Sequence, residues 1–179
     1  MSKVVVFLRG VNVGGVKVLM KDLSALLIAA GYTQVRTLLA SGNVVLDPGN
    51  ETVLEVQERC NQLLEAHYGR AIPTLVFSRE EIVALGGKFP LAIPEPVSEH
   101  HGYLTLCETT SKAEELYSLA RQAAPDAPLA VNGRSLCWIV RKGQSTTDPL
   151  AKLHTTQARK QIITTRNHNT LVKLASIVI

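Results

Sequence analysis

The sequence predicts an α+β fold in which two successive halves share one order of elements, strand–helix–strand–strand–helix–strand, each followed by an additional helix. Three observations support this prediction. Short β-branched runs alternate with segments whose apolar residues recur at helical spacing. A stretch with three prolines and no periodicity, residues 88–101, separates two such passes. Hairpin turns within each half indicate antiparallel sheets covered by helices on one face. We therefore expect two tandem ferredoxin-like subdomains, residues 1–87 and 102–179, joined by this linker.

The first half opens with an apolar run at residues 3–8, which predicts a buried strand. Residues 19–30 repeat leucine and alanine at helical spacing and predict the first helix. Two strands, residues 35–39 and 44–46, follow with Ser41-Gly42-Asn43 between them, a sequence typical of a hairpin turn.

The rest of the first half contains two helix starts. Asn50 is placed to cap a helix over residues 51–68, because an asparagine side chain can accept from the free N–H groups of the first turn. Residues 72–77 are expected to form the next strand. Ser78 and Glu81 have the spacing of a capping box and predict a short helix that follows.

The second half repeats this order. A strand is expected over residues 102–107, and Ser111 with Glu114 matches a second capping box. Asn132-Gly133, between two apolar runs, is the strongest hairpin signal in the chain.

The chain closes with two helices and a strand. Asp148 followed by Pro149 places a cap and then a proline at the first helical position, so a helix should follow to about residue 160. A short strand is expected over residues 162–165, and residues 168–177 have the pattern of a final helix.

The loop after the first strand is the first candidate binding segment. Its residues include Arg9, Gly10, Asn12, Gly14 and Gly15. Glycines can adopt positive φ and let main-chain N–H groups converge on an anion, and the start of the next helix adds a positive dipole end. The alternative is a tight crossover in which the glycines satisfy only geometry and Arg9 pairs with an acidic residue.

A second candidate segment is the polar run at residues 164–170, which contains Arg166, Asn167 and Asn169. An arginine offers a planar fork of donors that matches a carboxylate or a phosphate. The alternative is a helix cap with an arginine that locks the last helix onto the sheet. Ser41 and Asn43 would form a polar lip beside the first loop, although turn chemistry alone also explains them.

Composition and charge limit the other functional classes. The net charge of +4 is unevenly distributed, because residues 134–179 hold eight Lys or Arg and one acidic residue, whereas residues 51–133 hold six against twelve. This basic region could bind nucleic acid, or it could be a solvated face that balances the acidic middle, as in a homodimer. The basic loop around Lys142 is either solvated or a lid over an anion.

No catalytic or metal-binding signature is present. The sequence lacks a nucleophile motif with its base, and His100 and His101 have no partner at metal-ligand spacing, so we expect no metal and no cofactor. The three cysteines are expected to be reduced core thiols. No apolar run could span a membrane and no signal peptide is evident, so a cytoplasmic location is expected.

Two motifs at the ends of the chain resemble one known family, the bacterial domain of unknown function 1697 family. They are LRGVNVGG at residues 8–15, with SGNV at 41–44, and TTRNHNTLVKL at 164–174. Two positions depart from the family pattern: His168 stands where a tryptophan is usual, and residues 38–40 replace an aromatic residue and a glutamine. The resemblance implies a small cytoplasmic α+β protein of two similar ferredoxin-like subdomains. It implies no established activity, cofactor or catalytic residue.

From the residues themselves, the leading hypothesis is a binding protein for a phosphorylated or otherwise anionic small ligand. The first loop would form one wall of its site and the Arg166–Asn169 segment the other. Nucleic-acid binding through the basic region, or a protein–protein interaction module, is the alternative.

Overall fold

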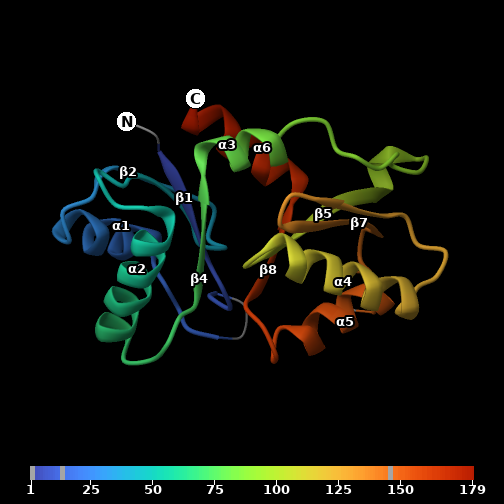
Figure 1. The fold of residues 1–179 in the computed structure, drawn as a ribbon, viewed down its shortest axis with the longest axis horizontal. Coiled ribbons are helices and arrows are strands. Elements are labelled where there is room, and N and C mark those ends of the chain that lie inside the picture. The colour runs from blue at the N-terminus through green and yellow to red at the C-terminus, as the bar shows by residue number, and fades with distance from the viewer. Residues whose placement is uncertain (1–2, 13–14, 145–146) are drawn as a thin grey trace. The chain divides into compact units, whose positions relative to one another are not determined.

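The computed structural model describes residues 3–12, 15–144 and 147–179. Its chain divides into two compact units, Met1–Ala84 with Leu174–Ile179, and Leu85–Lys173. Each unit contains one four-stranded antiparallel sheet with helices packed on it (Figure 1). The predicted α+β fold with tandem β-α-β-β-α-β halves is therefore confirmed.

The first unit has the sheet order β2-β3-β1-β4, in which every pair of neighbours is antiparallel. Its elements in chain order are β1 (Val4–Leu8), α1 (Met20–Ala29), β2 (Thr33–Leu38), β3 (Asn43–Asp47), α2 (Val53–Tyr68), β4 (Thr74–Ser78) and the start of α3 (Arg79–Leu85). Helices α1 and α2 cover one face of this sheet (Figure 1).

Strand β1 lies at the centre of the first sheet, and all five of its residues are buried. Its alternate residues Val4, Val6 and Leu8 join the core beneath α1 and α2. On the other face Phe7 packs edge-on against Phe77, with ring centroids 5.6 Å apart. Burial on both faces explains why this strand is a continuous apolar run without polar alternation.

The second unit repeats the arrangement with the sheet order β6-β7-β5-β8. Its elements are the 3₁₀ turn η1 (Val97–Glu99), β5 (His100–Cys107), α4 (Thr110–Ala123), β6 (Leu129–Asn132), β7 (Ser135–Arg141), α5 (Pro149–Gln157), β8 (Ile163–Asn167) and the start of α6 (His168–Val178). Helices α4 and α5 pack on one face of its sheet (Figure 1).

Several predicted local signals are confirmed. Ser78 and Glu81 form the capping box of α3, with the Ser78 N–H donating to Glu81 and the Glu81 N–H donating to the Ser78 hydroxyl. The Asp148 side chain caps α5, and Pro149 is its first residue. Asn132 and Ser135 pair across the β6–β7 hairpin. Turn and cap chemistry acts over a few residues, so these features are readable without the tertiary structure.

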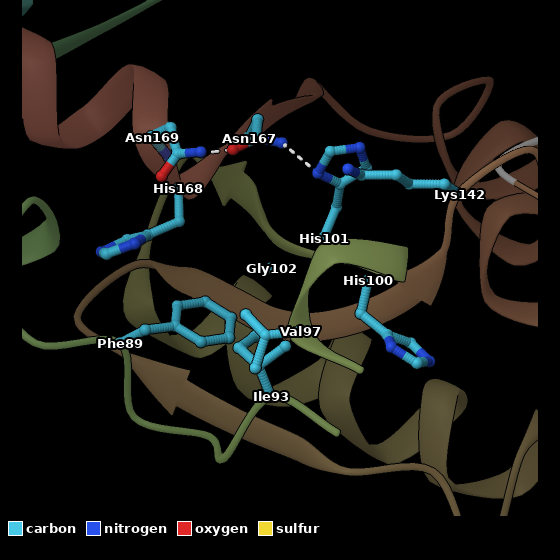
Figure 2. Close-up of a pocket in the computed structure, with 10 residues that line it drawn as sticks. All are labelled: Phe89, Ile93, Val97, His100, His101, Gly102, Lys142, Asn167, His168 and Asn169. Atoms are coloured by element: carbon cyan, nitrogen blue, oxygen red, sulfur yellow. Dashed lines mark hydrogen bonds between the residues drawn. The ribbon is translucent and has the colours of Figure 1, made fainter. Parts of the chain in front are cut away.

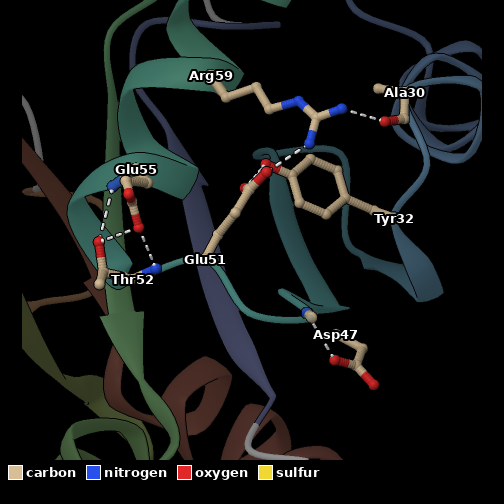
Figure 3. Close-up of polar contacts among 8 residues, drawn as sticks. Ala30, Tyr32, Asp47, Glu51, Thr52, Glu55 and Arg59 are labelled. Atoms are coloured by element: carbon tan, nitrogen blue, oxygen red, sulfur yellow. Dashed lines mark hydrogen bonds and ion pairs between the residues drawn. The ribbon is translucent and has the colours of Figure 1, made fainter.

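Three predicted boundaries are wrong. Thr52, not Asn50, caps α2, because Thr52 and Glu55 form a reciprocal capping box there (Figure 3). Thr109 caps α4 instead of Ser111. Strand β8 continues to Asn167 instead of ending at residue 165, since its last residues pair with β5. A polar strand end is stabilised by its ladder partner and has no apolar pattern to reveal it.

A polar clamp formed by Tyr32, Glu51 and Arg59 holds the end of α1 to the start of α2 (Figure 3). The Tyr32 hydroxyl donates to Glu51 at 2.6 Å, and Arg59 pairs with Glu51 and donates to the Ala30 carbonyl. Burial, and then the Glu51 hydrogen bond, raise the pKa of Tyr32. These side chains satisfy one another, which identifies the clamp as structural.

Candidate functional site

In the first loop, Asn12 is an internal organiser. Its side-chain oxygen accepts from the Val18 N–H at 2.9 Å, and its amide group donates to the carbonyls of Val18 and Ala40 at 2.9 and 2.7 Å. Its own backbone is in the left-handed region, with φ of 59°. Both amide hydrogens are therefore used to close the loop and to tie it to the β2–β3 turn.

The other predicted residues of this loop have varied surroundings. The main-chain N–H of the half-buried Arg9 donates to the Pro73 carbonyl at 3.0 Å. Gly10 and Gly15 are exposed, and Gly10 has a φ of 66°. Gly14 lies outside the described residues. The structure thus leaves exposed glycines in this loop, but it commits the Arg9 N–H and the Asn12 amide to internal contacts.

The predicted polar lip, Ser41 and Asn43, lies beside the first loop. The Leu8 N–H donates to the Gly42 carbonyl at 2.8 Å. Asn43 is fully buried and donates to the Leu38 carbonyl at 2.7 Å and to the Ser41 hydroxyl at 3.0 Å. Both Asn43 amide hydrogens therefore stabilise the turn itself.

The second predicted segment lies in the second unit, whereas the first loop and the turn lie in the first. Arg166 and Asn167 are adjacent in β8, so they project to opposite faces of the sheet. Arg166 is 7% exposed, and its guanidinium donates to the Thr164 hydroxyl at 2.6 Å and to the Thr165 carbonyl at 3.0 Å. Burial lowers the pKa of Arg166 to about 10.

Asn167 and Asn169 line a pocket of about 250 Å³ in the second unit, close to the first residue of α6. Figure 2 shows Asn167, His101 and Lys142 on one side of this pocket, and Phe89, Ile93 and Val97 on the other. We refer to it as the α6 pocket. Its lining consists of Phe89, Ile93, Val97, His100, His101, Gly102, Lys142, Asn167, His168 and Asn169.

Asn167 determines which ring nitrogen of His101 accepts a hydrogen bond. The Asn169 N–H donates to the Asn167 side-chain oxygen at 2.9 Å, which fixes which end of the carboxamide is oxygen. The Asn167 amide nitrogen then faces His101 Nδ1 at 3.2 Å and must be the donor. His101 Nδ1 accepts this bond, so a neutral His101 carries its hydrogen on Nε2.

His168 and Phe89 form the other end of the pocket. His168 Nε2 lies 2.9 Å from the Gly87 carbonyl oxygen, which can only accept, so this nitrogen carries a hydrogen. The His168 and Phe89 rings are tilted, with centroids 5.0 Å apart. A Cβ on Gly102 would lie 2.8 Å from the Phe89 ring, so this glycine allows the ring to rest on the backbone of β5.

The charge of the α6 pocket is positive. Lys142 is its permanent cation, and no carboxylate is among its lining residues. The nearby Glu99 is held by Arg141, whose Nη2 lies 2.6 Å from its carboxylate. Within the described part of the chain, no residue forms a hydrogen bond or ion pair with the Lys142 ammonium. The pocket can therefore accept a negative charge without displacing an internal partner.

Of the residues that line the pocket, sequence reasoning placed Asn167 and Asn169 in a binding segment and gave the loop around Lys142 as a possible lid over an anion. His101 was considered only as a metal ligand, and no local pattern connected it with the others. Phe89 lies in a linker whose path no periodicity predicts. Only the pairing of β5 with β7 and β8 brings these side chains to one place.

A second polar cluster lies in the core between α5 and the sheet. His154 is 6% exposed and its Nε2 lies 3.4 Å from the Thr105 hydroxyl, which also accepts from Trp138 Nε1 at 3.0 Å and contacts the Thr165 hydroxyl. Among the described residues none hydrogen-bonds to His154 Nδ1. Burial lowers the pKa of His154 to about 4, so its ring is neutral at neutral pH. Its burial makes it a stability element.

Neither the cysteines nor any group of metal-ligating residues in the described ranges adds a further candidate site. Cys60, Cys107 and Cys137 are buried free thiols, as predicted. Burial raises their pKa values to about 12, 12 and 11, so the reactive thiolate form is disfavoured. No group of three or more His, Cys, Asp or Glu in the described ranges is placed to hold a metal ion.

Two cations of the basic C-terminal region are not free to contact a polyanion. Arg141 is neutralised by Glu99, and Arg166 is buried in the sheet. These contacts remove two of the eight positive charges on which the nucleic-acid hypothesis depends.

Comparison with known proteins gives a family. A family model described as "Protein of unknown function (DUF1697)" matches residues 1–137. The chain belongs to the DUF1697 family. The family predicted from the sequence is thereby confirmed; the match includes the first motif, at residues 8–15 and 41–44, and does not extend to residues 164–174. The family description assigns no activity.

The DUF1697 fold also occurs in a solved structure, that of conserved bacterial protein SP0830 from Streptococcus pneumoniae. This chain and SP0830 are 20% identical in sequence, and their structures superpose with a TM-score of 0.79. The superposition covers 99% of this chain and 98% of SP0830. At this identity the likeness concerns the fold alone. A search of curated proteins finds no match. Of the helices described in this DUF1697 chain, none has the length and apolar character needed to cross a membrane.

Proposed function

We propose that this protein binds a small anionic ligand in the α6 pocket. One observation carries the proposal: the lining combines an ammonium, three imidazoles and two carboxamides without a carboxylate. Hydrogen bonds to a charged group contribute about 1.5–3 kcal/mol each, so a few such donors around one anion give measurable affinity.

The donors are held in place before a ligand arrives. Asn167 caps α6 and fixes the orientation of His101, so one Asn167 amide hydrogen and the His101 Nε2–H are the preorganised donors. His100 and His168 each give a ring hydrogen to a main-chain carbonyl, so they shape the pocket. Preorganised side chains lose little conformational entropy on binding, which favours affinity for a small ligand. Lys142 is exposed and supplies the charge that attracts the anion.

The first loop is not part of the site that we propose. Because Asn12 and Asn43 spend their amide hydrogens on main-chain carbonyls or a neighbouring hydroxyl, they are better suited to shaping the first unit than to contacting an anion. Arg9 with the exposed Gly10 and Gly15 stays a separate candidate contact, and it requires its own variant.

The test is a titration with sodium sulfate and, separately, with sodium acetate. Binding is monitored through the side-chain and backbone NMR signals of residues 101, 142 and 167–169. Lys142→Ala should weaken anion binding by about tenfold, equivalent to about 1.4 kcal/mol. Lys152→Ala is the matched control, since Lys152 is an exposed lysine of α5 outside the pocket lining. Arg9→Ala should leave this binding unchanged.

Two results would contradict the proposal. One is the absence of saturable shifts at the pocket with either anion. The other is equal weakening by Lys142→Ala and Lys152→Ala, which would indicate a general charge effect. If only Arg9→Ala abolishes binding, the ligand site lies in the first loop instead.

A further inference from the structure

We infer that the ligand of the α6 pocket is a small aromatic carboxylate, a monoanion whose flat ring lies against Phe89. This inference rests on the proposed function and specifies the chemical class of the ligand. It follows from the two unlike sides of the pocket and from the number of charges available to it.

The apolar side of the pocket is partly exposed, with Phe89 and Ile93 half-buried. Phe89, Ile93 and Val97 come from the segment between α3 and β5 and lie across from His101 and Asn167 (Figure 2). Val97 is 52% exposed. A hydrated inorganic anion would leave these side chains in contact with water, whereas a ligand with an apolar body would cover them.

The Phe89 ring is held so that it presents a fixed surface. The backbone of Gly102 lies directly against it, at a distance that leaves no room for a Cβ. His168 contacts it at a centroid distance of 5.0 Å and is itself bonded to the Gly87 carbonyl. Aromatic rings pair in offset or edge-on arrangements with a defined partner plane, so a fixed ring favours a flat ligand over a flexible chain.

The polar side matches a single negative charge. Lys142 is the one permanently charged residue in the lining, and His101 presents an Nε2–H donor beside it. A phosphate monoester carries about −1.5 to −2 at pH 7 and is usually recognised by arginine forks. Arg141, which is next to Lys142 in the chain, already donates two hydrogen bonds to the Glu99 carboxylate. A carboxylate, with one charge and two acceptor oxygens, fits this donor set better.

The experiment compares four sodium salts at pH 7.5 on the full chain by NMR titration: acetate, cyclohexanecarboxylate, benzoate and phenyl phosphate. Benzoate should bind at least about tenfold more tightly than acetate and more tightly than cyclohexanecarboxylate, because only benzoate combines one charge with a flat ring. Phe89→Ala should bring the benzoate and acetate affinities to within about twofold of each other.

Two further variants separate ring stacking from general apolar contact and from loss of structure. Phe89→Leu keeps an apolar side chain, so it should retain a preference for both cyclic acids over acetate but lose the preference for benzoate over cyclohexanecarboxylate. Leu54→Ala removes an exposed apolar side chain from α2 in the first unit and should change none of the ratios. Retained NMR dispersion of the second unit in Phe89→Leu shows that the fold is intact.

Each outcome has one meaning. Equal affinities for acetate and benzoate in the native chain would overturn the inference while leaving the anion site of the proposed function standing. Tighter binding of phenyl phosphate than of benzoate would overturn the carboxylate assignment. No binding of any of the four anions would remove the proposed function itself.

Discussion

Gly42 packs against Leu8 so closely that a Cβ on Gly42 would lie 2.8 Å from the Leu8 Cβ. The same hypothetical atom would lie 3.0 Å from a methyl group of Val11. Since the Leu8 N–H also donates to the Gly42 carbonyl, the β2–β3 turn and the first loop form one packed structure. Two motifs that are more than 30 residues apart in the chain therefore share a structural explanation.

Gly42→Ala should destabilise the protein for two reasons. The added methyl group meets the side chains of Leu8 and Val11, and φ at this position is +79°, where a residue with a Cβ is strained. We expect the free energy of unfolding to fall by about 2–4 kcal/mol. Urea unfolding followed by circular dichroism measures this loss.

Gly49→Ala is the matched control for that measurement. Its φ is +63°, but nothing lies within 4 Å of the added methyl group. The free energy of unfolding should then fall only by the cost of placing a Cβ at positive φ, about 1–2 kcal/mol. Equal losses in the two variants would show that the contact with Leu8 does not contribute.

Asn12→Asp should separate the structural role of Asn12 from ligand binding. The carboxylate can still accept from the Val18 N–H, but it cannot donate to the Val18 and Ala40 carbonyls. The free energy of unfolding should fall by about 1–2 kcal/mol, while anion affinity at the α6 pocket stays unchanged. Asn50→Asp, at an exposed position that caps no helix, should leave both quantities unaltered. Loss of anion binding in Asn12→Asp would contradict this division of roles.

His154 should make the stability of the protein depend on pH. Burial lowers its pKa to about 4, whereas an unfolded histidine binds a proton near pH 6.5. Between these values the unfolded state holds more protons than the folded state, so stability falls as the pH decreases from about 6.5 to about 4. The loss attributable to His154 should reach about 3 kcal/mol.

His154→Phe is the variant that isolates this effect, because it keeps a ring beside Trp138 and removes the titrating group. The measurement is the free energy of unfolding at several pH values for both proteins. Relative to the native chain, His154→Phe should gain free energy of unfolding as the pH falls from 7 to 4. A constant difference would show that His154 does not carry the acid sensitivity.

Asn167→Asp should change the tautomer of His101 without removing the α6 cap. An aspartate still accepts from the Asn169 N–H, so the free energy of unfolding should stay within about 0.5 kcal/mol. Because a carboxylate cannot donate, His101 must place its hydrogen on Nδ1, which ¹⁵N NMR of the ring detects. The added negative charge should weaken anion binding by about tenfold or more.

Asn169→Asp adds the same charge to the pocket without touching His101. It should weaken anion binding but leave the His101 hydrogen on Nε2. If the tautomer is unchanged in Asn167→Asp as well, the hydrogen bond between Asn167 and His101 is not formed in solution.

The polar run before α6 shows why the site was harder to predict than the fold. Arg166, Asn167 and Asn169 were grouped because they are close in sequence. Their strand pairing instead buries Arg166 in one face of the sheet and turns Asn167 toward His101 on the other. A strand reverses the direction of its side chains at every residue, so proximity in sequence is a poor guide to a shared surface.

The linker gives the same lesson for the apolar side of the pocket. Residues 88–101 have no periodicity, and the sequence therefore predicts only that they connect the halves. In the folded chain Phe89 rests on Gly102, a residue of β5 outside the linker. The close approach of ring and backbone left no local signal.

By itself the sequence determined the two α+β halves, two of the four predicted helix caps, the hairpin turns, the buried thiols and the membership of the DUF1697 family. These depend on periodicity and on hydrogen bonds between residues a few positions apart, which any chain with the same local pattern would form. Only the tertiary structure decided that Asn12 and Asn43 serve the fold, and that His101, Lys142, Asn167 and Phe89 line one pocket. Those outcomes depend on the register in which distant strands pair, and register is set by packing of the whole sheet rather than by any single segment.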